Sequence, residues 1–355
     1  MMMTTSNRAA LAAALCGSAA FATPAMAQIP ELRIQSGGFD LRLTGGAAVQ
    51  GAIFDDDDPT TENNDGTVDL FARLNGEWTS DDGILIGANV EISNRKRETE
   101  TLNTGEIYGF VASDYGRLEV GLQDGPADVL AFHAPVIGLG QIRGDASRYA
   151  GSQALLSALD TRDAFKVIYL SPPVSGFRAG VSWSPRFRQN KDALNPRART
   201  IVKNPVELGA QFQQPVGDWI LGLSGGYAFG NADPITTRAD LSSWSVGTEA
   251  RRGPLRLGGA YVNRGNSNRL DRDFDQWEVN MGVSWVEDNW GASFSGAATI
   301  SGDQVNRSFG IGGFYALSRN FQLRADVVQF KETQLGRNRN VDNGLVAVLE
   351  LQFTI

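Results

Sequence analysis

The sequence predicts an all-β fold, a transmembrane antiparallel β-barrel of sixteen strands, and three observations lead to this prediction. The last strand alternates strictly up to the end of the chain, with Leu345, Leu349 and Phe353 on one face, as expected for a strand with one apolar side. Fifteen further segments have strand patterns, and no apolar run is long enough to cross a bilayer as a helix. Short turns and long polar loops alternate between these segments, as in even-stranded bacterial barrels.

The first 27 residues predict a secretory signal peptide that is removed. Arg8 supplies the positive charge, residues 9–22 form an apolar stretch, and Ala25-Met26-Ala27 fits an A-x-A cleavage site. We expect cleavage before Gln28. The only cysteine, Cys16, would leave with the signal, so the exported domain must be stable without disulfides.

Residues 28–355 are expected to form a single domain, because strand follows strand without a boundary. The strands are expected at residues 38–54, 67–79, 84–93, 105–113, 117–123, 165–171, 177–184, 205–213, 218–229, 241–251, 255–264, 274–286, 290–300, 307–317, 321–330 and 344–355. Seven tight turns between them are rich in Gly, Pro, Asn, Asp and Ser, which favour turns. The eight other connections are longer and polar, near 55–66, 94–104, 124–164, 185–204, 230–240, 265–273, 301–306 and 331–343. This alternation puts both chain ends on one side of the barrel.

Each predicted strand has an apolar face and a polar face. In the first strand, Phe39, Leu41 and Leu43 alternate with Asp40 and Arg42. One such strand would also suit a soluble antiparallel sheet. Sixteen in succession, with no helix to cover them, indicate lipid outside the barrel and water inside it. The low mean hydropathy of −0.21 agrees with this, because only alternate residues of such strands need to be apolar.

Aromatic residues predict the two interfaces of the membrane, where a ring can be buried while its polar atom stays hydrated. Those expected beside the short turns are Trp78, Trp219, Trp285, Trp290, Phe177, Phe321 and Phe353. Those expected toward the long loops are Trp183, Tyr227, Phe229, Trp244, Tyr261 and Trp277. Aromatic residues are common in strands of any protein, but two bands at opposite strand ends point to a membrane.

Charge and residue content argue against two classes of function. The formal net charge is −8, whereas a nucleic-acid partner requires a basic face. Hydrolysis requires a positioned base, usually histidine, beside a nucleophile or water. His133 is the only histidine and has no Ser or Asp constellation beside it, so no enzyme activity and no cofactor are predicted.

Two segments resemble the general bacterial porins. Residues 108–124 (YGFVASDYGRLEVGLQD) are similar to the hairpin that leads into the constriction loop of that family, and residues 167–177 are similar to its next hairpin. The resemblance is closest to the alphaproteobacterial type. It implies a homotrimer in the outer membrane, with periplasmic termini, that passes ions and small hydrophilic solutes by diffusion. A channel selective for sugars or anions, and more remotely a barrel enzyme, stay open as alternatives. One departure is the C-terminus, where Thr354 and Ile355 follow Phe353.

The connection at residues 124–164, called the long loop below, is the longest. Loops of this size are usually functional or disordered. Val129, Leu130, Phe132 and Leu156 make it too apolar for a solvated tail. We therefore expect it to fold into the barrel and narrow it, which is also its role in the resembling family. Without it, a barrel of sixteen strands leaves an aqueous channel.

Charged residues at the expected constriction would set the ion preference of a pore. Strand parity places Arg42, Arg73 and Arg117 on the inner wall, where the resembling porins carry a basic cluster; Glu106 stands at a third such place. The facing candidates on the long loop are Asp124, Asp128 and Asp145, together with Arg143 and Arg148. Alternatively, the wall arginines pair with Asp40, Asp69 or Glu119. The net acidity predicts at most a weak cation preference.

The sequence predicts no metal site. Asp55, Asp56, Asp57 and Asp58 could offer oxygen ligands to calcium, but the spacing of an EF-hand is missing. A solvated outer loop is the favoured interpretation, and divalent bridging to lipopolysaccharide is a second one. The expected partners are therefore membrane lipid, lipopolysaccharide, further copies of the chain and small solutes.

Overall fold

The structure is a computed structural model that describes residues 31–55, 63–94, 103–149, 154–159, 161–188, 200–270, 273–334 and 341–355. The expected signal peptide, Asp56, Asp57 and Asp58 lie outside the described residues. The strands are β1 (Leu32–Ser36), β2 (Phe39–Asp55), β3 (Asn64–Thr79), β4 (Leu85–Ser93), β5 (Asn103–Ser113), β6 (Gly116–Leu122), β7 (Phe165–Leu170), β8 (Phe177–Trp183), β9 (Arg186–Arg188), β10 (Thr200–Val216), β11 (Trp219–Ala232), β12 (Leu241–Arg252), β13 (Leu255–Asn263), β14 (Gln276–Val286), β15 (Trp290–Ser301), β16 (Gln304–Ala316), β17 (Phe321–Gln334) and β18 (Val341–Thr354). The helical turns are α2 (Pro126–Val129), η1 (Gln141–Arg143), η2 (Asp145–Arg148) and η3 (Pro234–Thr236).

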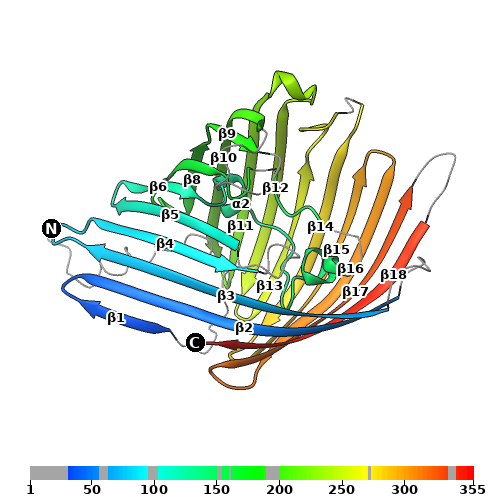
Figure 1. Ribbon diagram of the computed structural model, residues 1–355, viewed down its shortest axis with the longest axis horizontal. Coiled ribbons are helices and arrows are strands. Elements are labelled where there is room, and N and C mark those ends of the chain that lie inside the picture. The colour runs from blue at the N-terminus through cyan, green and yellow to red at the C-terminus, as the bar shows by residue number, and fades with distance from the viewer. Residues whose placement is uncertain are drawn as a thin grey trace.

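Sixteen of these strands close into an antiparallel barrel, which confirms the predicted fold class. Each strand from β2 to β8 pairs with the next, β8 pairs with β10, and the pairing continues to β18. The barrel closes where β18 pairs with β2, with Leu351 opposite Val49 (Figure 1). Closure joins the first and the last strand of the barrel edge to edge, as a barrel in lipid requires. We call the end of the barrel that carries the seven tight turns the short-turn end.

The two additional strands were not predicted. Strand β1 pairs with the first residues of β2, from Ser36 opposite Phe39 to Leu32 opposite Leu43. Gly37 and Gly38 both have positive φ, which the tight turn between these strands requires. Strand β18 covers β2 only from Gly46 onward, so β1 covers the rest of the same edge. Strand β9 continues β8 along β10.

The outer surface is apolar, as the side-chain alternation predicts. The exposed residues of β14 include Val279, Met281 and Trp285, while Glu278 and Asn280, on the opposite face of the strand, are buried inside. Aromatic rings touch across neighbouring strands: Trp244 and Tyr261 lie 5.3 Å apart between ring centroids, and Phe321 and Phe353 lie 5.1 Å apart. These pairs stand at opposite ends of the strands, in the positions of the two predicted bands.

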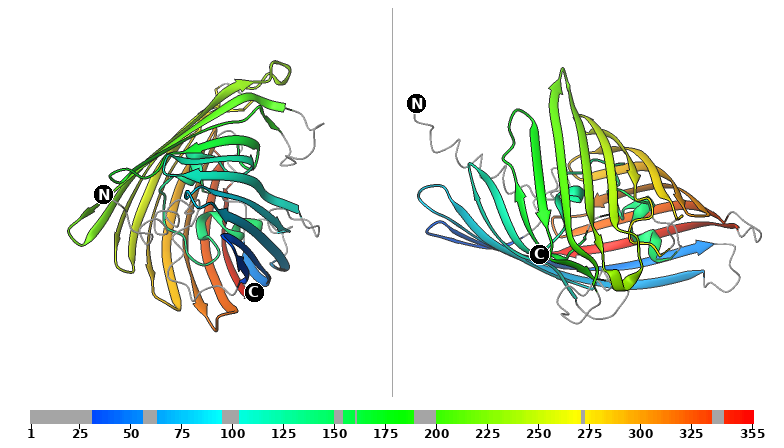
Figure 2. Two further views of the ribbon diagram at one scale, coloured as in Figure 1. Left: turned by 90° about the vertical axis from the view of Figure 1, so that its left-hand side faces the viewer. Right: turned by 90° about the horizontal axis from the view of Figure 1, so that it is seen from above.

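Strand ends differ most from the prediction where they are polar. The strand expected at 205–213 extends over Thr200–Val216, because its ends carry residues such as Lys203 and Gln214 that apolar alternation does not detect. The helical turns α2, η1 and η2 lie within the curve of the sheet (Figure 2). Among the described residues, no helix is long and apolar enough to cross a membrane.

Candidate pore constriction

The backbone of the long loop is hydrogen-bonded to side chains that point into the barrel. Phe132 N donates to Ser224 Oγ of β11 at 2.7 Å, and Ala134 N donates to Asn280 Oδ1 of β14 at 2.9 Å. Ile137 N then donates to Ser293 Oγ of β15 at 2.8 Å. The chain thus follows the inner wall from strand to strand, and each hydrogen bond satisfies a backbone donor that packing against the wall removes from water.

Inward-facing glycines let the loop lie close to this wall. A Cβ added at Gly226 of β11 would stand 2.8 Å from Ala127 O, and one at Gly258 of β13 would stand 2.6 Å from His133 O. Such distances are too short for real Cβ contacts, so any larger residue would displace the loop. The sequence shows these glycines clearly, but only the structure identifies their neighbour as the chain's own loop.

A buried carboxylate on β17 holds the middle of the loop. Asp326 accepts hydrogen bonds from Leu139 N at 3.0 Å and from Gln141 N at 2.6 Å. The Gln141 side chain reaches the wall of β15, where its Nε2 donates to Ser293 Oγ at 2.6 Å and its Oε1 accepts from Ser295 Oγ at 3.2 Å. Sequence reasoning missed Asp326, although a carboxylate at an inward position between Ala325 and Val327 is a detectable signal.

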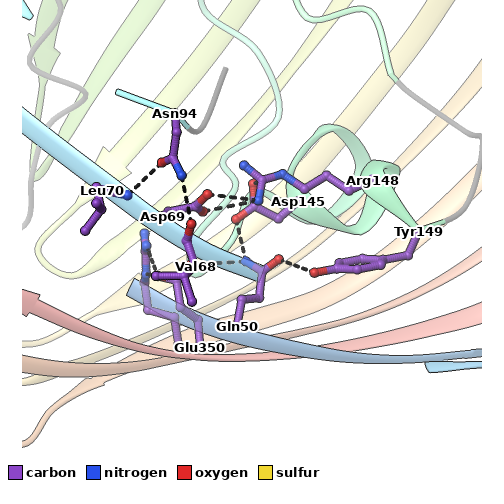
Figure 3. Close-up of polar contacts among 10 residues, drawn as sticks. Gln50, Val68, Asp69, Leu70, Asn94, Asp145, Arg148, Tyr149 and Glu350 are labelled. Carbon is purple, nitrogen blue, oxygen red and sulfur yellow. Dashed lines mark hydrogen bonds and ion pairs between the residues drawn. The ribbon is translucent and has the colours of Figure 1, made fainter. Parts of the chain in front are cut away.

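The tip of the loop then reaches β2, β3 and β18 (Figure 3). Arg148 Nη1 lies 3.2 Å from an Asp69 carboxylate oxygen of β3, and Gln50 Nε2 of β2 donates to Asp145 Oδ2 at 2.8 Å. Tyr149 donates its hydroxyl proton to Gln50 Oε1 at 2.7 Å. Burial raises the pKa of Tyr149 to about 12, so the hydroxyl keeps the proton that it donates. Asp145 and Arg148, two predicted site residues, are therefore brought to the inner wall.

Asp69, Asp145 and Glu350 form a compact carboxylate group with oxygens within 4.8 Å of one another. Arg148 contacts both Asp69 and Asp145, and Arg324 of β17 forms an ion pair with Glu350. These two cations account for the group as an ion-pair network between loop and wall.

One buried glutamate of β10 contacts the end of the long loop. Glu207 Oε1 accepts from Thr161 N at 3.0 Å and lies 3.2 Å from Lys166 Nζ, and neither the glutamate nor the lysine side chain is exposed beyond 1%. Lys166 also donates to Arg162 O at 2.8 Å. A Cβ at Gly125, near the start of the loop, would overlap the Glu207 carboxylate. Glu207 therefore lies between the two stems of the loop. Strand parity predicts that it faces inward, but its contact with the loop appears only in the structure.

The predicted wall arginines all pair with wall carboxylates. Arg42 lies 2.5 Å from Glu77 and 3.5 Å from Asp40, and Arg73 pairs with Glu91. Their side chains are 30% and 50% exposed, so both face the lumen.

Arg117 differs from the other two wall arginines, because its side chain is only 3% exposed. It pairs with Glu119 and stacks over the Phe110 ring at 3.5 Å. Of the three carboxylates considered as alternative partners, Asp40 and Glu119 thus pair with arginines of the wall. The third, Asp69, pairs with the loop.

The remaining predicted residues stand elsewhere along the loop. Asp124 lies at its first stem, where its carboxylate groups with those of Glu106 and Asp163. Asp128 lies in α2, and Arg143 ends η1 with an exposed side chain. Of the calcium candidates, Asp55 is described as the last residue of β2.

Comparisons with known proteins agree with this architecture. The sequence matches a family model described as Gram-negative porin over residues 9–335. A search of curated protein sequences found no significant match. A porin refined at 1.8 Å resolution superposes with a TM-score of 0.61 at 14% identity, covering 89% of this chain and 100% of that one.

Two further solved structures are similar. The anion-selective porin from Comamonas acidovorans has a TM-score of 0.61 at 14% identity and covers 89% of this chain and 100% of its own. The outer membrane channel DcaP of Acinetobacter baumannii has a TM-score of 0.62 at 12% identity, with 91% of this chain and 99% of that one covered. At these identities the likeness shows the fold alone.

Proposed function

This chain belongs to the Gram-negative porin family, and from that premise we propose that residues 124–164 narrow its lumen and set the size of solute that passes. The protein is an outer-membrane porin, a water-filled channel. The observation that carries the proposal is the run of hydrogen bonds from loop backbone to inward side chains of β11, β14, β15 and β17. The open lumen of a sixteen-stranded barrel would be wider without such a loop.

In this proposal the narrowest free lumen lies between the long loop and the stretch of wall that carries Arg42 and Arg73. Arg42 and Arg73 on that wall carry exposed guanidinium groups, and Arg143 is exposed on the loop. Asp124, Asp128, Asp145, Arg117 and Arg148 line or support the same passage in this proposal. Charges fixed beside a narrow passage act strongly on ions, because the low-dielectric wall focuses the field.

Transport is passive in this proposal, and the protein is a channel rather than an enzyme. His133 supports this, because its Nδ1 lies 2.8 Å from Ala134 O and burial lowers the pKa of the ring. The His133 side chain therefore packs within the loop and is not placed beside a nucleophile.

Liposome swelling with sugars of increasing mass tests passive diffusion. The expected rate falls steadily with solute mass and rises linearly with concentration. Saturation by one sugar, or block of the conductance by it, would replace this proposal with a substrate-selective channel on the same barrel.

We further propose a homotrimer whose termini face the periplasm, with the signal cleaved before Gln28. Strands β6, β7 and β8 are short, with 7, 6 and 7 residues. Their outer side carries exposed Leu118, Val120 and Tyr169, which form an apolar face for a neighbouring barrel or for lipid. Native mass spectrometry of the exported protein measures both the subunit number and the mass of the mature chain. A monomer, or a retained signal, would contradict these two points.

The outer loop that begins at Asp55 is proposed to be solvated, in contact with lipopolysaccharide. Calorimetric titration with calcium checks the competing interpretation, since binding would assign Asp55–Asp58 to a metal site.

A further inference from the structure

Two arginines of the inner wall face each other directly at the short-turn end. Arg251 of β12 and Arg256 of β13 are cross-strand partners, two residue pairs from the tight turn that joins the strands. Both lie on the inward face, because Glu249 and Ala260 of the same parity are buried inside the barrel. We call these two residues the arginine pair.

The arginine pair shares one carboxylate. Arg251 Nε lies 2.8 Å from Glu249 Oε1, and Arg256 contacts the other oxygen, Glu249 Oε2. Within the part of the chain that the structure describes, Glu249 is the only carboxylate in ion-pair contact with either arginine. Two positive charges therefore balance one negative charge, and like charges directly opposite each other in a sheet are unfavourable.

Exposure adds to this imbalance. The Glu249 side chain is 2% exposed, whereas those of Arg251 and Arg256 are 31% and 27% exposed. Solutes in the lumen can therefore reach the guanidinium groups, whereas the Glu249 carboxylate is buried beneath them. Each guanidinium has five N–H donors in a fixed fork, so most of them stay available to a ligand in the lumen.

Other arginines of the inner wall have at least one carboxylate each. Arg42 and its cross-strand partner Arg33 contact two carboxylates, Asp40 and Glu77, and Arg73 pairs with Glu91. Charges in those groups balance, while the arginine pair has surplus base. The difference makes the arginine pair a distinct electrostatic feature of the lumen.

The long loop passes close to the arginine pair. Its backbone passes over Gly258, the residue two beyond Arg256, with a Cβ there 2.6 Å from His133 O. The arginine pair thus lies beside the part of the inner wall that the loop backbone covers.

We propose that Arg251 and Arg256 form an anion-binding station at the short-turn mouth of the channel, for small oxyanions of the phosphate or carboxylate class. Two adjacent guanidinium forks match the oxygens of such an anion, and charge-assisted bonds of this kind are strong. The station rests on the proposed channel function and specifies a solute for it. Its sign is opposite to the weak cation preference that the net charge predicts.

Planar-bilayer recordings of the full-length protein in KCl test the station, with inorganic phosphate as the probe. In the wild type, phosphate added at the short-turn side is expected to reduce the conductance. The double variant Arg251→Gln/Arg256→Gln is expected to raise the half-blocking concentration about tenfold, since both charged partners of the anion are gone. Arg252→Gln is the matched control, because Arg252 has outward parity and pairs with exposed Asp218 at 3.0 Å.

A second variant guards against misfolding. The double variant leaves Glu249 buried without a cation, which is costly, so the triple variant with Glu249→Gln as well removes both signs of charge. Weaker phosphate block and a shift of the reversal potential toward cations in either variant support the station. Unchanged block in both variants, or a wild type that phosphate does not affect, overturns it. A wild type that forms no channels at all would instead overturn the proposed function.

Discussion

Replacing Gly226 with valine tests whether the long loop rests on the inner wall in the working channel. The added Cβ would stand 2.8 Å from Ala127 O, 3.1 Å from Ser245 Oγ and 3.3 Å from Ala127 Cα. Relief of the shortest contact alone requires a shift of roughly 0.6 Å, and the two methyl groups of valine reach about 1.5 Å further. The loop must therefore move toward the lumen axis by about 2 Å, and overpacking of this kind costs about 1–3 kcal/mol of stability.

Single-channel conductance is the assay, with heat-modifiable gel mobility to verify that the barrel is folded. We expect a lower conductance for Gly226→Val. The matched control is Gly225→Val in the same strand, because Gly225 faces outward and a Cβ there has its nearest neighbour at 3.8 Å. That control should conduct like the wild type. A folded Gly226→Val channel with wild-type conductance would refute the placement of the loop.

Three further predictions concern the anchors of the loop. Asp326→Asn replaces one of the two oxygens that accept from Leu139 N and Gln141 N with an amide nitrogen that cannot accept. Loss of one such hydrogen bond costs about 0.5–1.5 kcal/mol, so open-channel noise should rise. Noise equal to the wild type would show that Asp326 is not an anchor. Glu207→Gln leaves Lys166 buried without its anion, which destabilises the barrel by about 3–5 kcal/mol. The barrel should therefore unfold at a lower temperature on gels. An unchanged unfolding temperature would contradict the contact between Glu207 and the loop stem. Burial holds the pKa of His133 below 6.5, so its contribution to stability is complete above that pH and is lost as the pH falls below it. His133→Asn should weaken this pH dependence of unfolding. Identical pH profiles for the variant and the wild type would contradict the prediction.

Strand periodicity predicted the barrel, because lipid outside and water inside impose the same alternation on every strand. The closing strand illustrates this, since Leu345, Leu349 and Phe353 lie outside while Val346, Val348 and Glu350 are buried inside. Alternation could not predict β1 or β9. Strand β1 has only five residues, and Pro185 interrupts the strand that β9 continues, so neither leaves a periodic pattern long enough to recognise.

The candidate site was predicted in its residue types more than in its geometry. Arg42 and Arg73 follow from strand parity, because a residue on a strand has one of two faces. The partners of Asp145 and Arg148 could not be predicted, because they depend on where the loop crosses strands far away in the sequence, such as β2 and β3. That crossing depends in turn on the inward glycines and on Asp326, whose roles appear only when loop and wall are seen together.

Burial also decides how the charges act. Net acidity predicted at most a weak cation preference, yet acids such as Glu249 and Glu350 are buried behind arginines that the lumen can reach. Composition counts every charge equally, whereas an ion in the channel responds to the exposed ones. Reversal potentials in a salt gradient decide between the two expectations.

The central claim, an open channel lined by the long loop, is tested most directly by labelling one exposed loop position. The chain contains a single cysteine, Cys16, which lies in the expected signal peptide, so the cleaved chain has no background thiol. Arg143→Cys places a thiol at the end of η1. We predict stepwise channel conductance that falls when a charged methanethiosulfonate reagent is added to Arg143→Cys and does not change in the wild type. Conductance of Arg143→Cys that stays constant, with mass spectrometry showing complete labelling, would contradict the account.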